Sequence, residues 1–388
     1  MKSGCDKRFL IVVGTTFLFL VLPFMVVAVE RKKPMKILMI VARFPQVSNI
    51  SNMNQITGLI DRGHTVHIFS MAEGDYINVQ EDVIKYDLIN KMIDQLPADL
   101  NQYDIVMFQM GHKLFDIRTT HNFKGKIVVC FRGYDITGYL KQNPHAYDEY
   151  FKICNLFMPV CEAFKELLEQ EGCDPDKIIV HHSAVDCKKF KFKIRELPQN
   201  GRINIVSAGR FVEKKGLEYA IRAVARLLQK YPNIRYTIVG DGRLKQRYQR
   251  LIEELNVGDN VRIDGWRTHD EYINILDRAH IFLLPSITAE NNNQEGIPNV
   301  LKEAMAMGLL VIATKHSGNT ELIEHKVSGL LVPERSSTLI MHKVEYLLNH
   351  PELWLSMQLA AAHKVHHEFN KDKENDKLEA IFYDLLGW

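Results

Sequence analysis

Short apolar runs alternate with helix-like segments along most of the chain. The runs are continuous and rich in β-branched residues, which is typical of strands buried on both faces, whereas apolar positions every three or four residues are typical of amphipathic helices. In the first half this pattern predicts strands at 37–41, 66–69, 105–108, 127–131 and 178–180, with helices at 54–62 and 161–170. In the second half it predicts strands at 203–207, 235–239, 261–264, 281–284 and 309–313, with helices at 217–231, 245–255, 269–276 and 299–307.

This strand–helix order predicts parallel, doubly wound sheets and therefore an α/β protein. The order breaks between residues 186 and 202, where several lysines, Pro198 and Gly201 are typical of a linker. We therefore expect two Rossmann-like domains in tandem, at 35–195 and 200–365. Residues 366–388 are predicted to be a helix whose apolar stripe needs a partner surface. The stripe consists of Leu378, Ile381, Phe382, Leu385 and Leu386.

The amino-terminal segment contains a long uncharged stretch. Phe9 to Val29 is 21 residues without a charge, and about 20 apolar residues span a bilayer as a helix. We expect residues 1–34 to be a single apolar helix that anchors the protein to a membrane. Two alternatives are a cleaved signal peptide and a true start at Met35. Positive charges flank both ends, so the orientation of the anchor stays open.

The charge balance and the cysteines narrow the class of function. The chain has 49 Lys+Arg against 47 Asp+Glu, and a net charge of +2 argues against nucleic acid as the main partner. The six cysteines form no C-x-x-C pair, and the histidines lack suitably spaced carboxylates, so no metal site is expected. Free thiols are typical of a reducing compartment, which favours a cytoplasmic location for the two domains.

A basic, glycine-containing turn joins a predicted strand to a predicted helix at 207–216. Ligands bind where strands of a parallel sheet end, and a helix amino terminus favours an anion. Gly209 and Gly216 allow tight backbone, while Arg210 and Lys215 add two cations. The turn is therefore a candidate diphosphate-binding site, and the alternative is an exposed basic turn.

A second motif places two glutamates eight positions apart at the start of the helix predicted at 299–307. Gly296 and Pro298 place Glu295 in the preceding loop, with Pro298 near the first helical position and Glu303 inside the helix. Free amides of the first turn favour a phosphate, and carboxylates accept hydrogen bonds from polyols. The motif therefore suggests a sugar phosphate, although ordinary acidic residues on a helix are the alternative.

A third glycine-containing stretch, Gly240-Asp241-Gly242, ends a predicted strand. It lacks the third glycine of a dinucleotide fingerprint, because Lys245 stands there, and NAD binding is therefore disfavoured. Walker, G-x-S-x-G and H-E-x-x-H motifs are not found in the sequence.

Together these motifs resemble those of the retaining glycosyltransferases of family four, which have the two-domain GT-B fold. The Gly-Arg…Lys-Gly turn and the glutamate-seven-glutamate motif carry the resemblance, and 318–323 with 329–332 fit its continuation. A narrower group is similar in the first half as well. This narrower group is the colanic acid and amylovoran exopolysaccharide transferases. The residues that resemble it are 44–45, 54–59, 131–136 and 172–178.

The resemblance implies a cleft between the two domains and a last helix that crosses back to the first domain. It implies that Arg210 and Lys215 hold the donor diphosphate, that Glu303 binds the ribose and that Glu295 faces the donor sugar. The loop at Arg267 would contact the nucleobase. No cofactor or metal is implied, because the cations stabilise the leaving diphosphate. The implied donor-binding residues are Gly209, Arg210, Lys215, Arg267, Glu295, Gly296, Ile297, Pro298, Asn299, Val300 and Glu303, and the implied catalytic residues are Arg210, Lys215 and Glu295.

The acceptor side departs from the family pattern. Ser48 and Asn49 stand in a loop where many relatives have two glycines, and Arg132 stands where many have histidine. Arg132 could meet a phosphate or an anionic acceptor, or pair with Asp135. These four residues are the acceptor-side candidates.

We expect a retaining glycosyltransferase that moves a sugar from a UDP- or GDP-linked donor to a saccharide acceptor at a membrane surface. We expect this acceptor to be linked to a lipid. Such a reaction belongs to the synthesis of an exopolysaccharide or another cell-surface glycan. One alternative is a nucleotide-sugar 2-epimerase, which shares the GT-B architecture. The other is a non-catalytic, membrane-anchored protein that binds sugar nucleotides.

Overall fold

The computed structural model describes residues 32–46, 50–75 and 81–388, of which Pro34–Trp388 form one compact unit. The apolar helix predicted within residues 1–34 and the candidates Ser48 and Asn49 lie outside the described residues. Of the helices in the described ranges, none has both the length and the apolar character needed to cross a membrane.

The first sheet is parallel throughout, with the strand order β3-β2-β1-β4-β5-β6. Met39 of the central strand pairs with Ile68 on one side and Met107 on the other, and all three are buried. Its strands are β1 (Lys36–Val41), β2 (Thr65–Ser70), β3 (Met92–Ile93), β4 (Ile105–Phe108), β5 (Lys126–Phe131) and β6 (Leu156–Pro159). Together with its helices, this sheet forms the first lobe.

The second sheet is also parallel, with the order β12-β11-β10-β7-β8-β9. Counted from its own first strand, this is the same 3-2-1-4-5-6 order, which is the Rossmann arrangement. Its strands are β7 (Asn204–Ala208), β8 (Arg235–Val239), β9 (Val261–Ile263), β10 (Ile281–Leu284), β11 (Leu310–Thr314) and β12 (Leu330–Val332). Together with its helices, this sheet forms the second lobe, so the prediction of two Rossmann-like, parallel-sheet units is confirmed.

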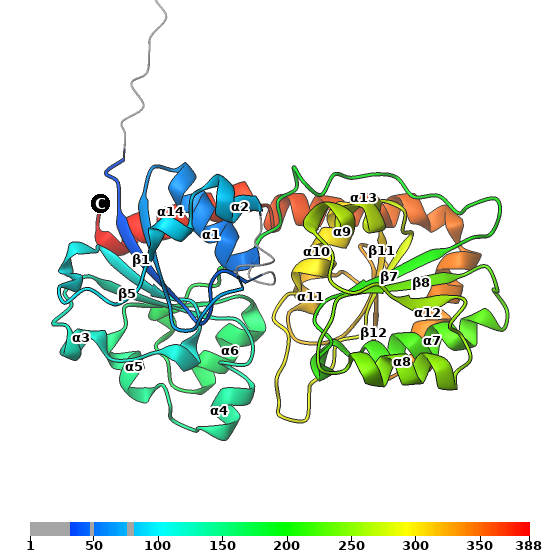
Figure 1. Ribbon diagram of the computed structural model, residues 1–388, viewed down its shortest axis with the longest axis horizontal. Coiled ribbons are helices and arrows are strands. Elements are labelled where there is room, and N and C mark those ends of the chain that lie inside the picture. The colour runs from blue at the N-terminus through cyan, green and yellow to red at the C-terminus, as the bar shows by residue number, and fades with distance from the viewer. Residues whose placement is uncertain (1–31, 47–49, 76–80) are drawn as a thin grey trace, which may run out of the picture. The chain divides into compact units, whose positions relative to one another are not determined.

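Helices surround both sheets (Figure 1). Those of the first lobe are α1 (Ile50–Asp61), α2 (Glu81–Lys85), α3 (Ile117–Thr120), α4 (Gly138–Gln142), α5 (Asp148–Ile153) and α6 (Glu162–Gln170). Those of the second lobe are α7 (Leu217–Leu228), α8 (Lys245–Glu254), α9 (His269–Asp277), α10 (Asn299–Ala306), α11 (Asn319–Leu322) and α12 (Ser337–Asn349). Local sequence explains several helix starts; α9, for example, begins with a capping box between Thr268 and Glu271.

The last two helices, α13 (Trp354–Glu368) and α14 (Lys371–Leu386), connect the two lobes. Helix α13 contacts α10 of the second lobe, and α14 contacts α1 of the first, as Figure 1 also shows. Leu378 and Phe382 of the apolar stripe are fully buried in the core beneath β1. The side-chain amide of Asn375 donates to the backbone carbonyl oxygen of Asn54 at 3.1 Å. The first lobe therefore supplies the surface that covers the stripe.

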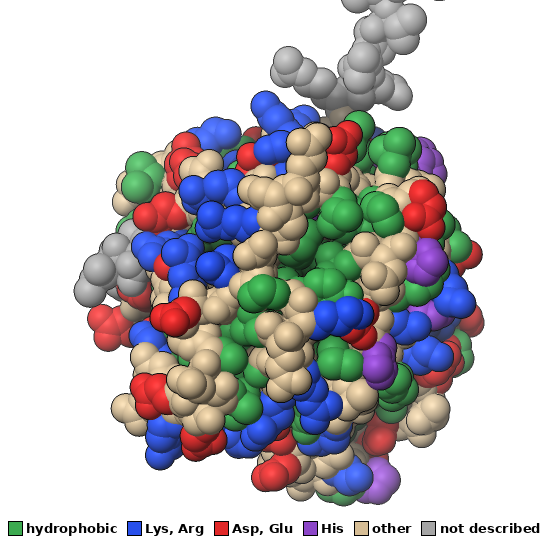
Figure 2. Space-filling model, turned by 90° about the vertical axis from the view of Figure 1, so that its right-hand side faces the viewer, with side chains coloured by type: hydrophobic (Ala, Val, Ile, Leu, Met, Phe, Trp, Pro, Cys, Tyr) green, Lys and Arg blue, Asp and Glu red, His purple; other side chains and the backbone are tan. Residues whose placement is uncertain are grey.

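The outer surface of the second lobe mixes side chains of different kinds. Figure 2 shows one face of it, where Lys and Arg side chains gather toward one side and apolar ones lie across the middle. All of the described cysteines are buried without a disulfide partner, and burial raises the pKa of each thiol, so they are protonated at neutral pH. These residues are Cys130, Cys154, Cys161, Cys173 and Cys187.

One predicted strand is wrong. Residues 178–180, which the structure describes, form only an isolated bridge between Ile178 and Phe157. The sixth strand is instead β6, whose sequence Leu-Phe-Met-Pro lacks β-branched residues and ends in proline. Burial against β5 overrides this weak local preference, because strand propensity depends mainly on packing.

Candidate functional site

The turn at 209–216 lies at the carboxyl end of β7 and leads through a short 3-10 helix, η5 (Glu213–Lys215), into α7. Gly209 and Gly216 have φ values of +138° and +58°, a region that favours glycine. A Cβ on Gly216 would lie 2.0 Å from the Pro285 carbonyl oxygen. The glycines therefore allow the turn to pass close to the end of β10.

Two lysines of this turn converge on Glu295. The Nζ atoms of Lys214 and Lys215 lie 3.5 and 3.2 Å from Oε1 of Glu295, and all three side chains are about nine-tenths buried. Burial alone would raise the pKa of Glu295, but the two ammonium groups outweigh it and hold the pKa at about 2. Burial lowers the pKa of Lys214, and Glu295 opposes that change. The carboxylate is therefore ionised, and Arg210 adds a further positive charge near it.

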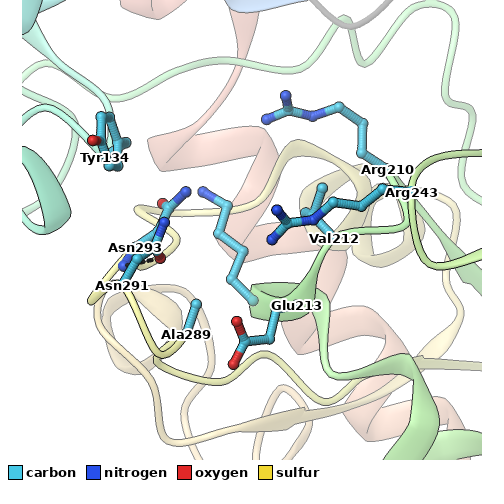
Figure 3. Close-up of a pocket in the computed structure, with 9 residues that line it drawn as sticks. Tyr134, Arg210, Val212, Glu213, Arg243, Ala289, Asn291 and Asn293 are labelled. Carbon is cyan, nitrogen blue, oxygen red and sulfur yellow. Dashed lines mark hydrogen bonds between the residues drawn. The ribbon is translucent and has the colours of Figure 1, made fainter.

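A cavity of about 320 Å³ opens beside this cluster, at the low end of the size range of small-molecule sites (~300–1,000 Å³). Figure 3 shows Arg210 and Arg243 extending side by side, toward Tyr134 of the first lobe. Lys214 and Glu213 also line the cavity. Three cations and one carboxylate give it a net positive lining, which suits an anionic ligand such as a diphosphate.

Arg243 reaches the cavity because the loops after β7 and β8 are joined. The amide of Phe211 donates to the Asp241 carbonyl oxygen at 2.7 Å. A Cβ on Gly240 would lie 2.0 Å from the Gly209 carbonyl oxygen, so this glycine is needed for the close approach. The Gly240-Asp241-Gly242 stretch thus brings the two loops together at the edge of the sheet.

The second glutamate, Glu303, is buried in α10. Its exposure is 1 %, and among the described residues neither carboxylate oxygen has a hydrogen-bond partner of standard geometry. Burial raises its pKa to about 7, against the opposing effects of Lys302 and Tyr272. A buried carboxylate with the Tyr272 hydroxyl as its one neighbouring donor in the described ranges is costly, and hydroxyl groups of a polyol would supply more donors.

Helix α10 begins at Asn299, as predicted, with Pro298 as its N-cap. The loop before it touches the first lobe: a Cβ on Gly296 would lie 2.5 Å from Cγ2 of Val160. Ile297 is buried, and Asn299 donates to Ser51 at 3.0 Å. Val300 is half-buried. The start of α10 therefore lies where the two lobes meet.

Arg267 lies apart from the cavity lining. Its guanidinium pairs with Asp264 at 2.8 Å, in the loop that follows the edge strand β9. The carbonyl oxygen of Gly265 in this loop accepts a hydrogen bond from the Gly240 amide at 2.8 Å. The loop is thus tied to the site through β8, and the predicted nucleobase contact of Arg267 stays a prediction.

In the first lobe, Arg132 and Asp135 do not pair through their side chains. Asp135 is fully buried, and its oxygens accept the backbone amides of Arg132, Gly133 and Gly111 at 2.8 to 3.1 Å. Asp135 thus shapes the turn, and its predicted contact with an acceptor stays a prediction. The guanidinium of Arg132 donates to the side chains of Gln55 and Gln109.

A second cavity, of about 420 Å³, lies in the first lobe and is called the aromatic cavity here. Aromatic side chains lie between it and the positively lined cavity of about 320 Å³ described above, the charged cavity. The His112 ring is 5.6 Å from that of Tyr134 and 5.7 Å from that of Tyr139. Tyr134 in turn lines the charged cavity. The aromatic cavity is lined by His112, Tyr139, Asn143, His145, Tyr147 and Tyr150.

Sequence reasoning missed Lys214, Arg243, His316 and Glu334. Lys214 could have been found from its neighbour Lys215, and Arg243 from its position after a strand of the same sheet. His316 and Glu334 gave no such signal, since they follow β11 and β12 and meet Glu295 only in the fold. The Glu295 amide donates to Nε2 of His316 at 3.1 Å, and Nδ1 of that ring lies 2.6 Å from Glu334.

Solved structures share this fold. A glycosyltransferase from Rickettsia africae matches with a TM-score of 0.71 and 20% identity, over 91% of this chain and 99% of that one. The Anabaena protein Alr3699/HepE, solved in complex with UDP, matches with a TM-score of 0.72 and 16% identity, over 90% of this chain and 100% of that one. The two lobes therefore define a protein with a GT-B-like fold.

Sequence comparisons then give the family. The model for glycosyl transferases group 1 matches residues 188–364. The chain is 30% identical to the amylovoran biosynthesis glycosyltransferase AmsK of Erwinia amylovora, over 87% of this chain and 96% of that protein. It is 29% identical to the putative colanic acid biosynthesis glycosyltransferase WcaL of Escherichia coli K12, over 90% of this chain and all of that protein. The chain therefore belongs to the group 1 glycosyltransferases.

Proposed function

We propose that this glycosyltransferase moves a sugar from a nucleoside diphosphate onto a saccharide, with retention at the anomeric carbon. The observation that carries the proposal is the convergence of Lys214, Lys215 and Arg210 around Glu295, where strands of the second sheet end. Structures of the similarly folded HepE protein are described as complexes with UDP and with UDP-glucose, which supports a nucleotide-sugar donor. The comparisons do not favour an epimerase or a non-catalytic protein.

In this proposal the cations stabilise the diphosphate as it departs. The bond from the anomeric carbon to the diphosphate oxygen breaks, a bond to the acceptor oxygen forms on the same face, and the acceptor proton passes to the departing diphosphate. Glu295 is paired with two lysines and so orients the donor rather than attacking it. Charge stabilisation of this kind is the largest contribution in many enzymes. Four cations, Arg243 among them, supply it without a metal.

Glu303 completes the donor site in this proposal. Its buried oxygens would accept hydrogen bonds from the ribose hydroxyls, which offsets the cost of burying a carboxylate beside the single hydroxyl of Tyr272. The ligand would then span the sheet edge from the turn at 209–216 to the interior of α10.

The acceptor would occupy the aromatic cavity of the first lobe. The apolar face of a sugar ring packs against aromatic rings, while His112 and Asn143 can hydrogen-bond its hydroxyls. Tyr134 lies between this cavity and the charged one, so an acceptor there would present one hydroxyl to the donor. The names of AmsK and WcaL refer to amylovoran and colanic acid, which supports an exopolysaccharide intermediate as acceptor.

A lipid-linked acceptor would place the reaction at a membrane surface, with the lobes on the cytoplasmic side. The support is the uncharged segment 9–29, which is long enough to span a bilayer. Full-length protein should sediment with phospholipid vesicles, and a variant that begins at Met35 should not. Equal sedimentation of both forms would contradict an anchor in this segment.

The reaction itself is tested by a product assay. Purified protein is incubated with UDP- and GDP-linked sugars and an oligosaccharide acceptor, with and without EDTA, and products are identified by mass spectrometry and by NMR of the anomeric proton. We expect one donor to yield an elongated acceptor whose anomeric configuration matches the donor, unaffected by EDTA. Inversion would contradict the retaining reaction, and sugar epimerised without acceptor would contradict transfer.

A further inference from the structure

A pair of side chains next to the cation cluster holds the backbone of Glu295. His316 and Glu334 follow the adjacent strands β11 and β12, and Thr288 follows β10. Nδ1 of His316 lies 2.6 Å from Oε1 of Glu334, whose other oxygen accepts the Thr288 amide at 2.9 Å. Three neighbouring strand ends thus supply one connected set of hydrogen bonds.

The hydrogen bonds fix the tautomer of His316. Its Nε2 accepts the backbone amide of Glu295 at 3.1 Å, and because an amide can only donate, this nitrogen must carry the lone pair. The single proton of the neutral ring then resides on Nδ1, where it is donated to Glu334. A second proton, on Nε2, would set two donors against each other and break the contact with Glu295.

The peptide between Gln294 and Glu295 is held from both sides. Lys214 donates to the Gln294 carbonyl oxygen at 2.9 Å, while His316 accepts the Glu295 amide. The His316 side chain is 1 % exposed, and the amide of the preceding Lys315 continues the ladder to Val332 at 2.8 Å. The imidazole therefore has little freedom to move relative to the sheet.

We propose that His316, oriented by Glu334, is a positioning residue that fixes the Glu295 carboxylate for donor use and does so only in its neutral, Nδ1-protonated form. This inference rests on the proposed function, because it assigns Glu295 to the donor. His316 itself acts through the Glu295 peptide, as ligand-orienting partners do around metal sites.

Charged and polar groups face both nitrogens of His316. Glu334 faces Nδ1, and the Glu295 amide faces Nε2. Lys214 and Lys215 pair with the Glu295 carboxylate, and Arg335 donates to the Thr288 carbonyl oxygen on the far side of Glu334. A proton added to Nε2 by acid would therefore release the Glu295 peptide, since two donors would then face each other.

Four variants test the proposal through kcat and KM for the donor, measured at neutral and at acidic pH. His316→Ala should lower kcat about tenfold or more, the range found for orienting partners, with little change in UDP affinity because the cations remain. His316→Gln keeps an oxygen near the position of Nε2 that accepts an amide and does not titrate. It should restore most of the lost kcat and abolish the fall in rate at acidic pH.

Glu334→Ala removes the acceptor of the Nδ1 proton and should lower kcat, because the His316 ring loses its orienting partner. His325→Ala is the matched control, since Nδ1 of His325 also accepts a backbone amide, from Leu331 at 2.9 Å. It should leave kcat and the pH profile unchanged. Equal losses in His316→Ala and His325→Ala, or no rescue by His316→Gln, would overturn the proposal.

A measurement without turnover separates this inference from the proposed function. Nitrogen-15 NMR of histidine-labelled protein, with His316→Gln used to assign the signal, reports which ring nitrogen carries the proton. The Nδ1-protonated form is expected, and the Nε2-protonated form would overturn the inference even if transfer is observed. Absence of transfer with every donor, together with the Nδ1-protonated form, would count against the proposed function alone.

Discussion

The two lobes place an arginine at comparable positions, just beyond a parallel strand, but use it differently. Arg132 follows β5, and its guanidinium donates hydrogen bonds to Gln55 and Gln109 of its own lobe. Arg210 follows β7, is exposed and lines a cavity with other cations. The same strand order thus supports a neutral, aromatic surface in one lobe and a charged one in the other. We infer that the first suits a saccharide and the second a diphosphate.

The largest expected effect comes from removing a cation of the second lobe. Lys215→Ala should lower kcat at least about a hundredfold, because loss of one preorganised charge at a developing anion costs roughly 3 kcal/mol. Initial rates measure it, and thermal unfolding checks that the fold is intact. Lys230→Ala, an exposed pair with Glu345 in the same lobe, is the control and should retain full activity. Near-normal turnover of Lys215→Ala would contradict the assignment.

The stability of the charged lobe should depend on the ionised form of Glu295. A carboxyl pKa lowered to about 2 contributes stability that is present above its ordinary value near 4.5 and is lost as pH falls toward 2. Glu295→Gln should therefore be less stable by about 3 kcal/mol at pH 7, following the size of the shift. Urea unfolding at falling pH should show this difference shrinking below about pH 4.5. A difference independent of pH would show that the charge is not responsible.

A smaller effect is expected in the aromatic lobe. Tyr139→Ala should raise the acceptor KM about tenfold, since one aromatic contact is worth ~1 kcal/mol or slightly more, with the donor KM unchanged. Tyr139→Phe keeps the ring and is the matched control. Steady-state kinetics with each substrate varied separately distinguishes the lobes. A rise in donor KM instead would mean that the two cavities do not divide the substrates in this way.

The smallest effect concerns a contact between the lobes. The Gln294 amide donates to Oγ1 of Thr137 at 3.2 Å, next to the peptide that Lys214 and His316 hold. Thr137→Val keeps the shape and removes this bond of about 1 kcal/mol, together with the bond that Oγ1 donates within the first lobe to the Gly133 carbonyl oxygen at 2.8 Å. Because only the first of these joins the lobes, kcat should fall only a few-fold. Stopped-flow or steady-state rates measure the change. A loss as large as that of Lys215→Ala would mean that the charged site depends on this contact between the lobes.

The central strands of both sheets could be predicted from sequence because burial on both faces imposes continuous apolar runs, as in Ile37–Val41. Edge strands carry a weaker signal. Residues 156–159 became β6 through pairing with β5, while the β-branched 178–180 stretch pairs at one bridge only. Such outcomes depend on which neighbour is available, which the local sequence does not encode.

Spacing along the sequence was enough to group Arg210 with Lys215 in one turn, and Glu295 in the loop before α10 with Glu303 inside that helix. The grouping of Lys214 with Gln294, and of Glu295 with His316, arises from loops far apart in sequence. In the same way, the burial of Asp135 follows from three backbone amides that meet only in the folded loop. These contacts depend on tertiary packing rather than on local pattern.

Calorimetric titration of nucleoside diphosphates tests the central claim, that a diphosphate binds to the cations of the second lobe. UDP and GDP are titrated into wild type, Lys230→Ala and the double variant Arg210→Ala/Lys215→Ala, with UMP and GMP as ligands that lack the second phosphate. The account predicts one site per chain for UDP or GDP, unchanged in Lys230→Ala and at least about a hundredfold weaker in the double variant, or ~2.8 kcal/mol. Equal affinity of the double variant and wild type would contradict it.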